Sequence, residues 1–269
     1  MGESMSFEKI AVESADGVTR ITLNNEKTLN ALSSRMLREL MEAMTTAAND
    51  DGCRVVVLTG AGRGFSSGAD LTDTSAPMPM KDGKPDMGAG LRTGYHPILQ
   101  TIRSMPKPVI AAINGPAAGA GCNLALACDI TVAKRSAKLI QAFIKIALVP
   151  DAGGTWSIPR LIGRALAMRW MMTGETITAG QAEHWGLLSY VVDDDQFEVE
   201  VDRLAKHFAT APTRGLGRIK QLVDASLDNT LHDQLELEAD MQTLMGQDQD
   251  MMEGMTAFMQ KRAPVFKGR

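Results

Sequence analysis

The sequence has few cysteines and histidines, and neither type is arranged to hold a metal. Its three cysteines, Cys53, Cys122 and Cys128, are odd in number and lack metal-ligand spacing, so we interpret them as reduced thiols of the core. The four histidines are scattered and do not pair with Cys or Glu at a ligand spacing. We therefore expect no metal site.

The sequence also lacks long apolar runs and an excess of positive charge. No stretch approaches the ~18 apolar residues that a membrane span requires, and residues 1–9 contain no apolar signal core. The formal net charge of −4 and the pI near 5.6 argue against a nucleic-acid-binding surface. We expect a cytoplasmic protein with no membrane or nucleic-acid partner.

What is present is the composition of an ordinary globular protein. The chain has 269 residues, of which 44% are apolar and 22% charged, so it can bury a large core. The first part is rich in strand-like segments, and the rest is almost wholly helical. We therefore predict a core over residues 1–196 and an appended helical segment over residues 197–269.

The individual elements follow from hydrophobic period and turn chemistry. Residues 8–23 predict a hairpin around Asp16-Gly17, and Ser33 or Ser34 is expected to cap a helix that runs to about Asn49. Residues 75–95 are rich in Pro, Gly and Met without a clear period, and they predict a mobile loop or flap. Further strands are predicted at 54–59, 109–113, 130–133, 138–142 and 189–192, further helices at 97–104, 156–162, 165–172 and 179–185, and helix breaks at 211–212, 229 and 246.

The rest of the chain is organised around residues 107–129, KPVIAAINGPAAGAGCNLALACD. Residues 109–113 are apolar and uncharged, which is typical of a strand covered on both faces. Residues 114–121 contain three glycines, three alanines and a proline, so the backbone can approach a ligand closely. From Ala120 the pattern is helical, and the unpaired N–H groups of a first helical turn would face a ligand over the turn. The stretch predicts a site for developing negative charge.

A second glycine-rich loop, residues 60–71, follows the strand predicted at 54–59. If the two strands lie in neighbouring layers of one core, the N–H groups near Ala69 and Ala120 can converge on one oxygen atom. That geometry is an oxyanion hole, which stabilises an enolate or a tetrahedral intermediate of a thioester or ester. The alternative is that both loops are merely tight turns, and spacing alone does not decide between the two.

Two other motifs overlap the second loop. Residues 64–68, GFSSG, match the G-x-S-x-G nucleophile elbow, but residues 69–79 contain two prolines and cannot begin the helix that the elbow requires. Residues 60–64, GAGRG, hint at a dinucleotide fingerprint, and they lack both the following helix and a suitably placed acid. Neither motif predicts a function.

Asp151 is the only carboxylate in a glycine-rich turn that follows an apolar run, LVPDAGG. One interpretation is an N-cap for the helix that begins near Gly153. The other is a general acid or base at a pocket wall, whose pKa burial would have to raise. The two interpretations predict opposite shifts of the Asp151 pKa.

Several segments together resemble the enoyl-CoA hydratase/isomerase, or crotonase, superfamily over essentially the whole chain. They are residues 29–32 (LNAL), 64–71 (GFSSGADL), 107–129, 150–155 (PDAGGT) and the AF and KR pairs within 257–262. The resemblance implies an α/β fold with a crotonase-like ββα spiral core and a C-terminal helical oligomerisation segment. It also implies a homotrimer or a dimer of trimers.

The resemblance also implies roles for individual residues. The N–H groups of Ala69 and Ala120 would hold the thioester oxygen of an acyl-CoA substrate, and Asp151 falls where several isomerases and a dehalogenase of the family keep a catalytic aspartate. Ser67 would lie near the adenine end, Asp70 would fix its loop, and Phe258 would reach the ligand of a neighbouring subunit. The residues predicted to contact substrate or coenzyme A are Lys27, Leu29, Ser67, Asp70, Leu71, Asn123, Phe143 and Phe258.

The sequence departs from the family's hydratases at two positions. Those enzymes carry one glutamate two residues beyond the last glycine of the GxG turn and another seven residues before the proline of the PxxGG turn. Here these positions are Asn123 and Phe143, and neither side chain can move a proton at neutral pH. The chain is more similar to members that use a single aspartate near two backbone donors.

The predicted function is therefore that of an acyl-CoA isomerase. It would shift a double bond, or open a ring epoxide, in a coenzyme A thioester through an enolate, with Asp151 as the single acid/base. No metal or redox cofactor is expected, because coenzyme A is part of the substrate. Two alternatives stay open: an enoyl-CoA hydratase with one carboxylate, or with a second group from residues 75–95, and a catalytically silent acyl-CoA-binding protein.

Overall fold

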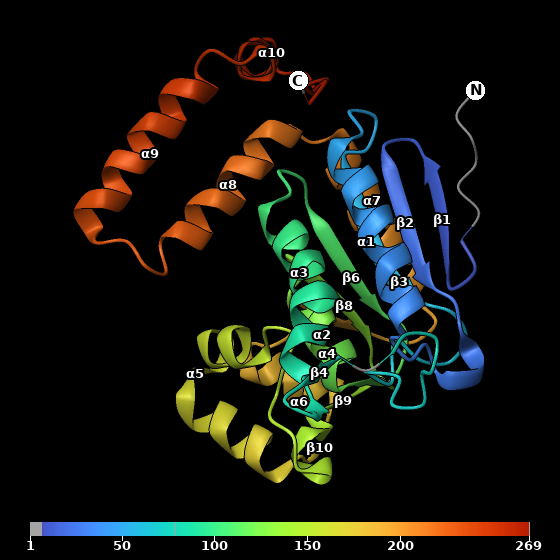
Figure 1. Cartoon of the computed structure of the whole chain (residues 1–269). Coiled ribbons are helices and arrows are strands. Elements are labelled where there is room, and N and C mark those ends of the chain that lie inside the picture. The colour runs from blue at the N-terminus through green and yellow to red at the C-terminus, as the bar shows by residue number, and fades with distance from the viewer. Residues whose placement is uncertain (1–6, 78, 269) are drawn as a thin grey trace.

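The computed structural model describes residues 7–77 and 79–268. Its centre is a six-stranded sheet in the order β1-β2-β3-β6-β8-β11 (Figure 1). β1 and β2 form the antiparallel hairpin predicted around Asp16-Gly17, and all other neighbouring strands are parallel. The strands are β1 (Ile10–Ala15), β2 (Val18–Leu23), β3 (Val55–Gly60), β6 (Val109–Ile113), β8 (Ile130–Lys134) and β11 (Tyr190–Val192).

Helices cover both faces of this sheet, which explains why its central strands are apolar throughout. Every residue of β3 and β6 is buried. Alternate residues of β3 belong to two separate clusters: Val56 and Leu58 pack with α1 (Ser34–Asn49) and α3 (Tyr95–Ser104), whereas Val55 and Val57 pack with α7 (Phe197–Thr210). Ser33 caps α1 by accepting from Met36 N, as predicted.

A second, three-stranded sheet lies beside the first and gives the core its second layer. Its order is β10-β9-β7, and β7 follows β6 directly along the chain. The chain thus passes from one sheet to the other at the glycine-rich turn before α4 (Gly119–Leu126). The remaining elements of this layer are β7 (Ala117–Ala118), β9 (Lys138–Ile140), a 3-10 turn η2 (Ala142–Ile146), α5 (Gly154–Thr173), β10 (Thr176–Thr178) and α6 (Ala179–Trp185).

The predicted helical segment consists of α7, α8 (Thr213–Ala225), α9 (Leu231–Met245) and α10 (Gln249–Gln260), with breaks at the predicted places. α7 packs on the sheet through Phe197, Val201 and Leu204, so it is part of the core. α8 to α10 extend away from the core (Figure 1). The helices that lie outside the core thus begin with α8 and not with α7 (Figure 1).

The expectation that residues 75–95 form a loop or flap is wrong in part, because the segment contains regular elements. Apart from Met78, which lies outside the described residues, this segment contains β4 (Met80–Lys81), β5 (Lys84–Pro85) and α2 (Met87–Thr93). β4 and β5 pair across an Asp82-Gly83 turn, in which both residues have positive φ, 51° and 73°. Such a turn matches the twist of a hairpin. Whether the segment moves stays a prediction.

Within residues 7–77 and 79–268, no helix has the length and apolar character needed to cross a membrane.

Candidate active site

The two glycine-rich loops lie side by side at the turn between the sheets. Ala118 N donates to Ser66 O (2.9 Å), and Ser66 N donates to Pro116 O (3.3 Å). Gly68 comes so close that a Cβ atom on it would lie 2.8 Å from Ala118 O and 3.6 Å from Ala120 N. Its φ of +95° is also one that glycine alone adopts freely. The fold therefore brings the two glycine-rich turns together, which is the condition that the oxyanion-hole interpretation required.

The N–H groups of Ala69 and Ala120 take no part in the hydrogen bonds that join the two loops to each other and to Leu32. Leu32 pairs with the second loop through Gly68 O and Asp70 N, so the intervening Ala69 N–H points away from Leu32. Ala120 belongs to the first turn of α4, whose N–H groups have no partner within the helix. Among the described residues, neither N–H donates a hydrogen bond. Their shared role as an oxyanion hole stays a prediction.

Asp151 precedes α5 but does not cap it, so the N-cap interpretation is wrong. The N-cap of α5 is Gly153, with no side-chain hydrogen bond. Ala152 and Gly153 both have left-handed φ values, 46° and 74°, and they separate Asp151 from the helix. For a non-glycine residue such as Ala152, this conformation costs ~1–2 kcal/mol. The turn therefore holds Asp151 in place at the expense of backbone strain.

The Asp151 carboxyl is in an environment that disfavours its charge. Its Oδ1 atom is buried and makes no hydrogen bond within the described residues. Burial raises the pKa of Asp151 to about 6, and the residue's own backbone N–H, which acts to lower the pKa, offsets only part of this rise. The acid/base interpretation predicted a raised pKa, and this is the direction found.

Tyr95 is a neighbour of Asp151 that the sequence did not reveal. It is the first residue of α3 and is buried. Burial raises the pKa of its phenol, and the negative charges of Asp151 and Asp70 raise it further, so Tyr95 is neutral at physiological pH. The predicted helix began two residues later, at Pro97, so no sequence pattern placed Tyr95 beside the site.

The two residues at the glutamate positions of hydratases lie next to the turns. Asn123 Nδ2 donates to Asp151 O (2.8 Å). The Phe143 ring lies against Gly119, where a Cβ atom would be 3.6 Å from it. Contact of either side chain with substrate stays a prediction, but both are positioned at the candidate site.

Four other predicted contact residues, Lys27, Leu29, Ser67 and Asp70, lie in two loops that hydrogen bonds hold in place. Lys27 and Leu29 belong to the 3-10 turn η1 (Glu26–Thr28) and its end, to which Ser67 is tied by a hydrogen bond from its Oγ to Thr28 O (2.8 Å). Asp70 fixes its own loop, as expected, because its Oδ1 accepts from Thr72 N (3.0 Å).

Two further predicted residues are strongly exposed. The side chain of Leu71 is 68% exposed, and that of Phe258 is 85% exposed. Phe258 lies on α10, far from α4 in the same chain (Figure 1). Its predicted role would therefore need a second subunit.

The serine of the G-x-S-x-G motif is not an exposed nucleophile. Ser66 is 1% exposed, its Oγ donates to Asn30 O (2.8 Å), and Gly68 N donates to that Oγ (3.2 Å). No helix follows it in the described chain before α2 at Met87. The structure thus argues against a nucleophile elbow, as the sequence did.

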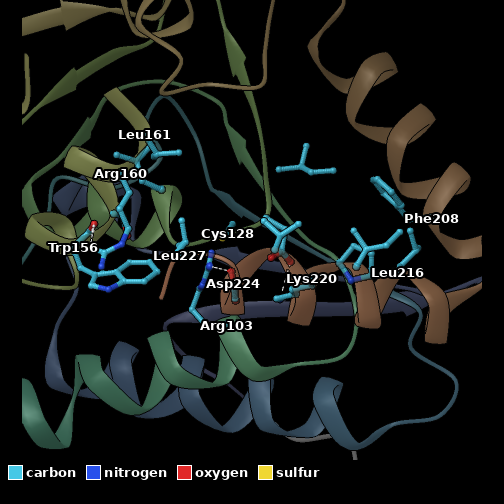
Figure 2. Close-up of a pocket in the computed structure, with 17 residues that line it drawn as sticks. Arg103, Cys128, Trp156, Arg160, Leu161, Phe208, Leu216, Lys220, Asp224 and Leu227 are labelled. Atoms are coloured by element: carbon cyan, nitrogen blue, oxygen red, sulfur yellow. Dashed lines mark hydrogen bonds and ion pairs between the residues drawn. The ribbon is translucent and has the colours of Figure 1, made fainter. Parts of the chain in front are cut away.

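A separate cavity of about 490 Å³ lies between α3, α5 and α8, and none of the predicted site residues lines it (Figure 2). At one end, the guanidinium groups of Arg160 and Arg103 lie 4.3 and 5.4 Å from the ring centre of Trp156. Arg103 also pairs with Asp224 of α8 (Figure 2). The cavity thus lies between α8 and the core, and the Arg103–Asp224 pair connects the two across it.

Comparison with known proteins defines the family. Residues 13–269 match the family described as Enoyl-CoA hydratase/isomerase. The chain is 45% identical to the 1,2-epoxyphenylacetyl-CoA isomerase of Escherichia coli K12 over 94% of its own length and 96% of that protein. It is 36% identical to the 2,3-dehydroadipyl-CoA hydratase of the same strain, over 98% and 100% of the two chains.

Solved structures agree. The crystal structure of an enoyl-CoA hydratase from Polaromonas sp. JS666 has a TM-score of 0.88 and 35% identity, and the match covers 96% of this chain and 99% of that one. The chain belongs to the enoyl-CoA hydratase/isomerase family, whose members act on coenzyme A thioesters. The predicted resemblance and the crotonase-like α/β fold with a C-terminal helical segment are confirmed.

Proposed function

We propose that the protein is an acyl-CoA isomerase in which Asp151 is the single acid/base. The observation that carries this proposal is the Asp151 carboxyl itself, with a buried oxygen that has no hydrogen-bond partner among the described residues and a pKa raised to about 6. A general base works best when its pKa lies near the working pH. The isomerase among the relatives supports the same reaction class.

In the proposed reaction, the N–H groups of Ala69 and Ala120 hold the thioester oxygen. For a 3-enoyl-CoA, the Asp151 carboxylate takes a proton from C2, and the resulting dienolate is stabilised by both donors. Asp151 then returns the proton to C4, so the double bond moves from C3–C4 to C2–C3. One oxyanion donor of this kind contributes ~2.7–4 kcal/mol to lowering the barrier.

The first test is mass spectrometry of the products from a 3-enoyl-CoA and, separately, a 2-enoyl-CoA. We expect a product of unchanged mass and altered retention from the 3-enoyl substrate. Asp151→Asn should lower kcat by about 10²–10⁴-fold, the usual contribution of a general base, and leave acyl-CoA binding nearly unchanged. Unchanged turnover of this variant would refute the role of Asp151.

The pH dependence follows from the raised pKa. Because Asp151 must be ionised to accept a proton, kcat should be level above pH 7 and fall as the pH drops through about 6. A pH-rate profile measured between pH 4.5 and 8.5 checks this. A profile that stays level down to about pH 5, as the ordinary aspartate pKa of ~3.9 would give, would contradict the assignment of the titrating group to a buried carboxyl.

The second candidate is an enoyl-CoA hydratase, which the hydratases among the relatives favour. It would add one water to the 2-enoyl substrate, a mass gain that the same measurement detects. A catalytically silent acyl-CoA-binding protein would bind both thioesters and exchange no substrate proton with deuterated water. We further propose that the isomerase acts in the cytoplasm as a homotrimer or a dimer of trimers.

A further inference from the structure

A buried chain of amide groups lies beneath the turn that carries Asp151. Gln141 Nε2 donates to Asn123 Oδ1 (2.8 Å), and Asn123 Nδ2 donates to Asp151 O (2.8 Å). Gln141 is 0% exposed and Asn123 is 1% exposed. The chain joins three segments that are distant in sequence: α4, the end of β9, and the turn before α5.

The turn that this chain supports is not one that its backbone would favour by itself. Ala152 is a non-glycine residue at φ 46°, and Gly153 follows at φ 74°. Strained conformations of this kind persist only where the surroundings over-determine them. Here Asp151 O accepts from both Asn123 Nδ2 and Gly154 N, the latter at 2.9 Å. Two donors thus fix the carbonyl that precedes the strained pair.

Asn123 also packs directly against the start of α5. A Cβ atom on Gly154 would lie 2.3 Å from Asn123 Nδ2, so the glycine is needed for the amide to fit. At this position the side chain must donate to a carbonyl and accept from Gln141. A neutral amide does both, whereas a carboxylate has no donor. Asn123 is therefore chemically suited to the turn.

Among the described residues, no positive charge contributes to the pKa of Asp151. The titratable group on which its charge acts is Tyr95 of α3, whose pKa the carboxylates of Asp151 and of Asp70 in the second loop both raise. Below the turn, the Cys122 thiol of α4 contacts the Gln141 amide, and burial raises its pKa to about 12, so it is neutral. The behaviour of the Asp151 carboxyl therefore depends on where the backbone holds it.

We propose that Asn123, oriented by Gln141, is a positioning residue that locks the left-handed turn and so keeps the Asp151 carboxyl in its buried orientation. The inference rests on the proposed function, because it takes Asp151 as the acid/base. It gives a role to Asn123, which stands where hydratases carry a glutamate. In this chain the side chain at that position binds the backbone carbonyl of Asp151.

The test compares Asn123→Ala and the nearly isosteric Asn123→Leu with the wild type. Both remove the donor to Asp151 O. We expect kcat for a 3-enoyl-CoA to fall about 100-fold, a typical result of misplacing a catalytic group, with KM changed less than about threefold. The acid limb of the pH-rate profile should move from about 6 toward the ordinary aspartate value of ~3.9, as the released carboxyl becomes hydrated.

A second measurement does not depend on turnover. The carbon-13 resonance of the Asp151 carboxyl, assigned by its loss in Asp151→Asn, reports the pKa of the group directly. We expect the Asn123 variants to lower the pKa of Asp151, and Gln141→Leu to lower it by a smaller amount. If Asn123→Ala does not fold, Asn123→Leu and Gln141→Leu decide the question.

The matched control is Thr131→Val, a buried and nearly isosteric change in β8. It removes the hydrogen bond that Thr131 Oγ1 accepts from Ser189 N, just before β11. It should lower thermal stability and leave the acid limb and the carbon-13 titration in place. If the Asn123 variants behave like this control, the positioning role is wrong. If Asp151→Asn retains activity, the proposed function fails, and the titration still decides whether Asn123 positions the carboxyl.

Discussion

At Asp151, burial disfavours the ionised carboxylate that the proposed proton transfer requires. Burial raises its pKa to about 6, whereas an unfolded chain gives an aspartate a pKa of ~3.9. The folded state thus binds the proton more tightly than the unfolded state does. The stability that this proton contributes is fully present below about pH 4 and is lost as the pH rises through about 6.

Asp151→Asn should therefore stabilise the protein at high pH, where the wild type must bury a charge. A shift of about two pKa units corresponds to ~2.7 kcal/mol, and since the carboxyl is partly exposed we expect a gain of about 1–2 kcal/mol in the free energy of unfolding at pH 8. The gain should shrink toward pH 4. Calorimetric unfolding at the two pH values checks both statements.

Asp73 provides a control of opposite sign for the same substitution. Burial acts to raise its pKa, but hydrogen bonds from Ser75 and Ser34 outweigh burial and hold the pKa well below its usual range. Asp73→Asn should lower the unfolding temperature at pH 8. If Asp151→Asn and Asp73→Asn shift the unfolding temperature in the same direction, the argument that links the raised pKa of Asp151 to stability does not hold.

At the residue scale, the sequence indicated some site residues and not others, for a physical reason. Asp151 is recognisable because a carboxylate in a glycine-rich turn directly after an apolar run, LVPDAGG, is a local feature. Tyr95 and Gln141 were not, because each contributes through one neighbour brought to it by tertiary packing. Gln141 in particular lies within the strand predicted at 138–142, and its partner Asn123 is 18 residues away in the chain.

At the element scale, two turns with the same sequence had different outcomes. Asp16-Gly17 and Asp82-Gly83 both adopt positive φ at both positions and both close a hairpin. The first was predicted because residues of alternating character flank it. The second was missed because its flanking strands are only two residues long and are exposed, so no alternation marks them.

α8 is attached to the core by a buried ion pair that can be tested at this scale. Lys220 Nζ lies 2.8 Å from Asp129 Oδ2, and the side chains are 9% and 18% exposed. Burial raises the pKa of Asp129, and Lys220 offsets part of that rise. Lys220→Met would remove the ammonium group that neutralises the Asp129 carboxylate, to which Val109 N would still donate, and should cost ~3–5 kcal/mol of unfolding free energy in urea titrations.

The control for this change is Arg203→Met, which breaks an exposed pair with Glu200 on α7. Exposed pairs contribute ~0.2–1 kcal/mol, so little change is expected. The double variant Lys220→Met/Asp129→Asn should recover much of the loss, because it removes the unpaired charge. If Lys220→Met costs no more than Arg203→Met, the Lys220–Asp129 pair contributes little to the attachment of α8.

At the scale of the whole molecule, large apolar side chains are exposed along the helices that leave the core. Patches of this kind on a soluble protein mark interaction surfaces. Within the described part of the chain, these apolar side chains remain largely uncovered. The exposed residues on α8, α9 and α10 include Ile219, Val223, Leu231, Leu235, Leu244, Met252, Met255, Phe258 and Met259.

We predict that these helices join copies of the chain, so that the protein in solution has three or six times the monomer mass of 28.9 kDa. Met255 and Met259 are four residues apart on α10 and are 57% and 70% exposed, so Met255→Glu/Met259→Glu places two charges on one face of that helix. Light scattering coupled to gel filtration should show this variant shifted toward the monomer, because burying the charges would be costly.

Val199→Glu is the matched control, because Val199 is 62% exposed on α7 and not on the helices that extend from the core. This variant should keep the oligomeric mass of the wild type. If Phe258 completes a neighbour's site, the α10 variant should also lose affinity for acyl-CoA, whereas Val199→Glu should not. A wild-type protein that is monomeric at micromolar concentration would contradict the role of α8 to α10 and would leave Phe258 with no subunit to reach.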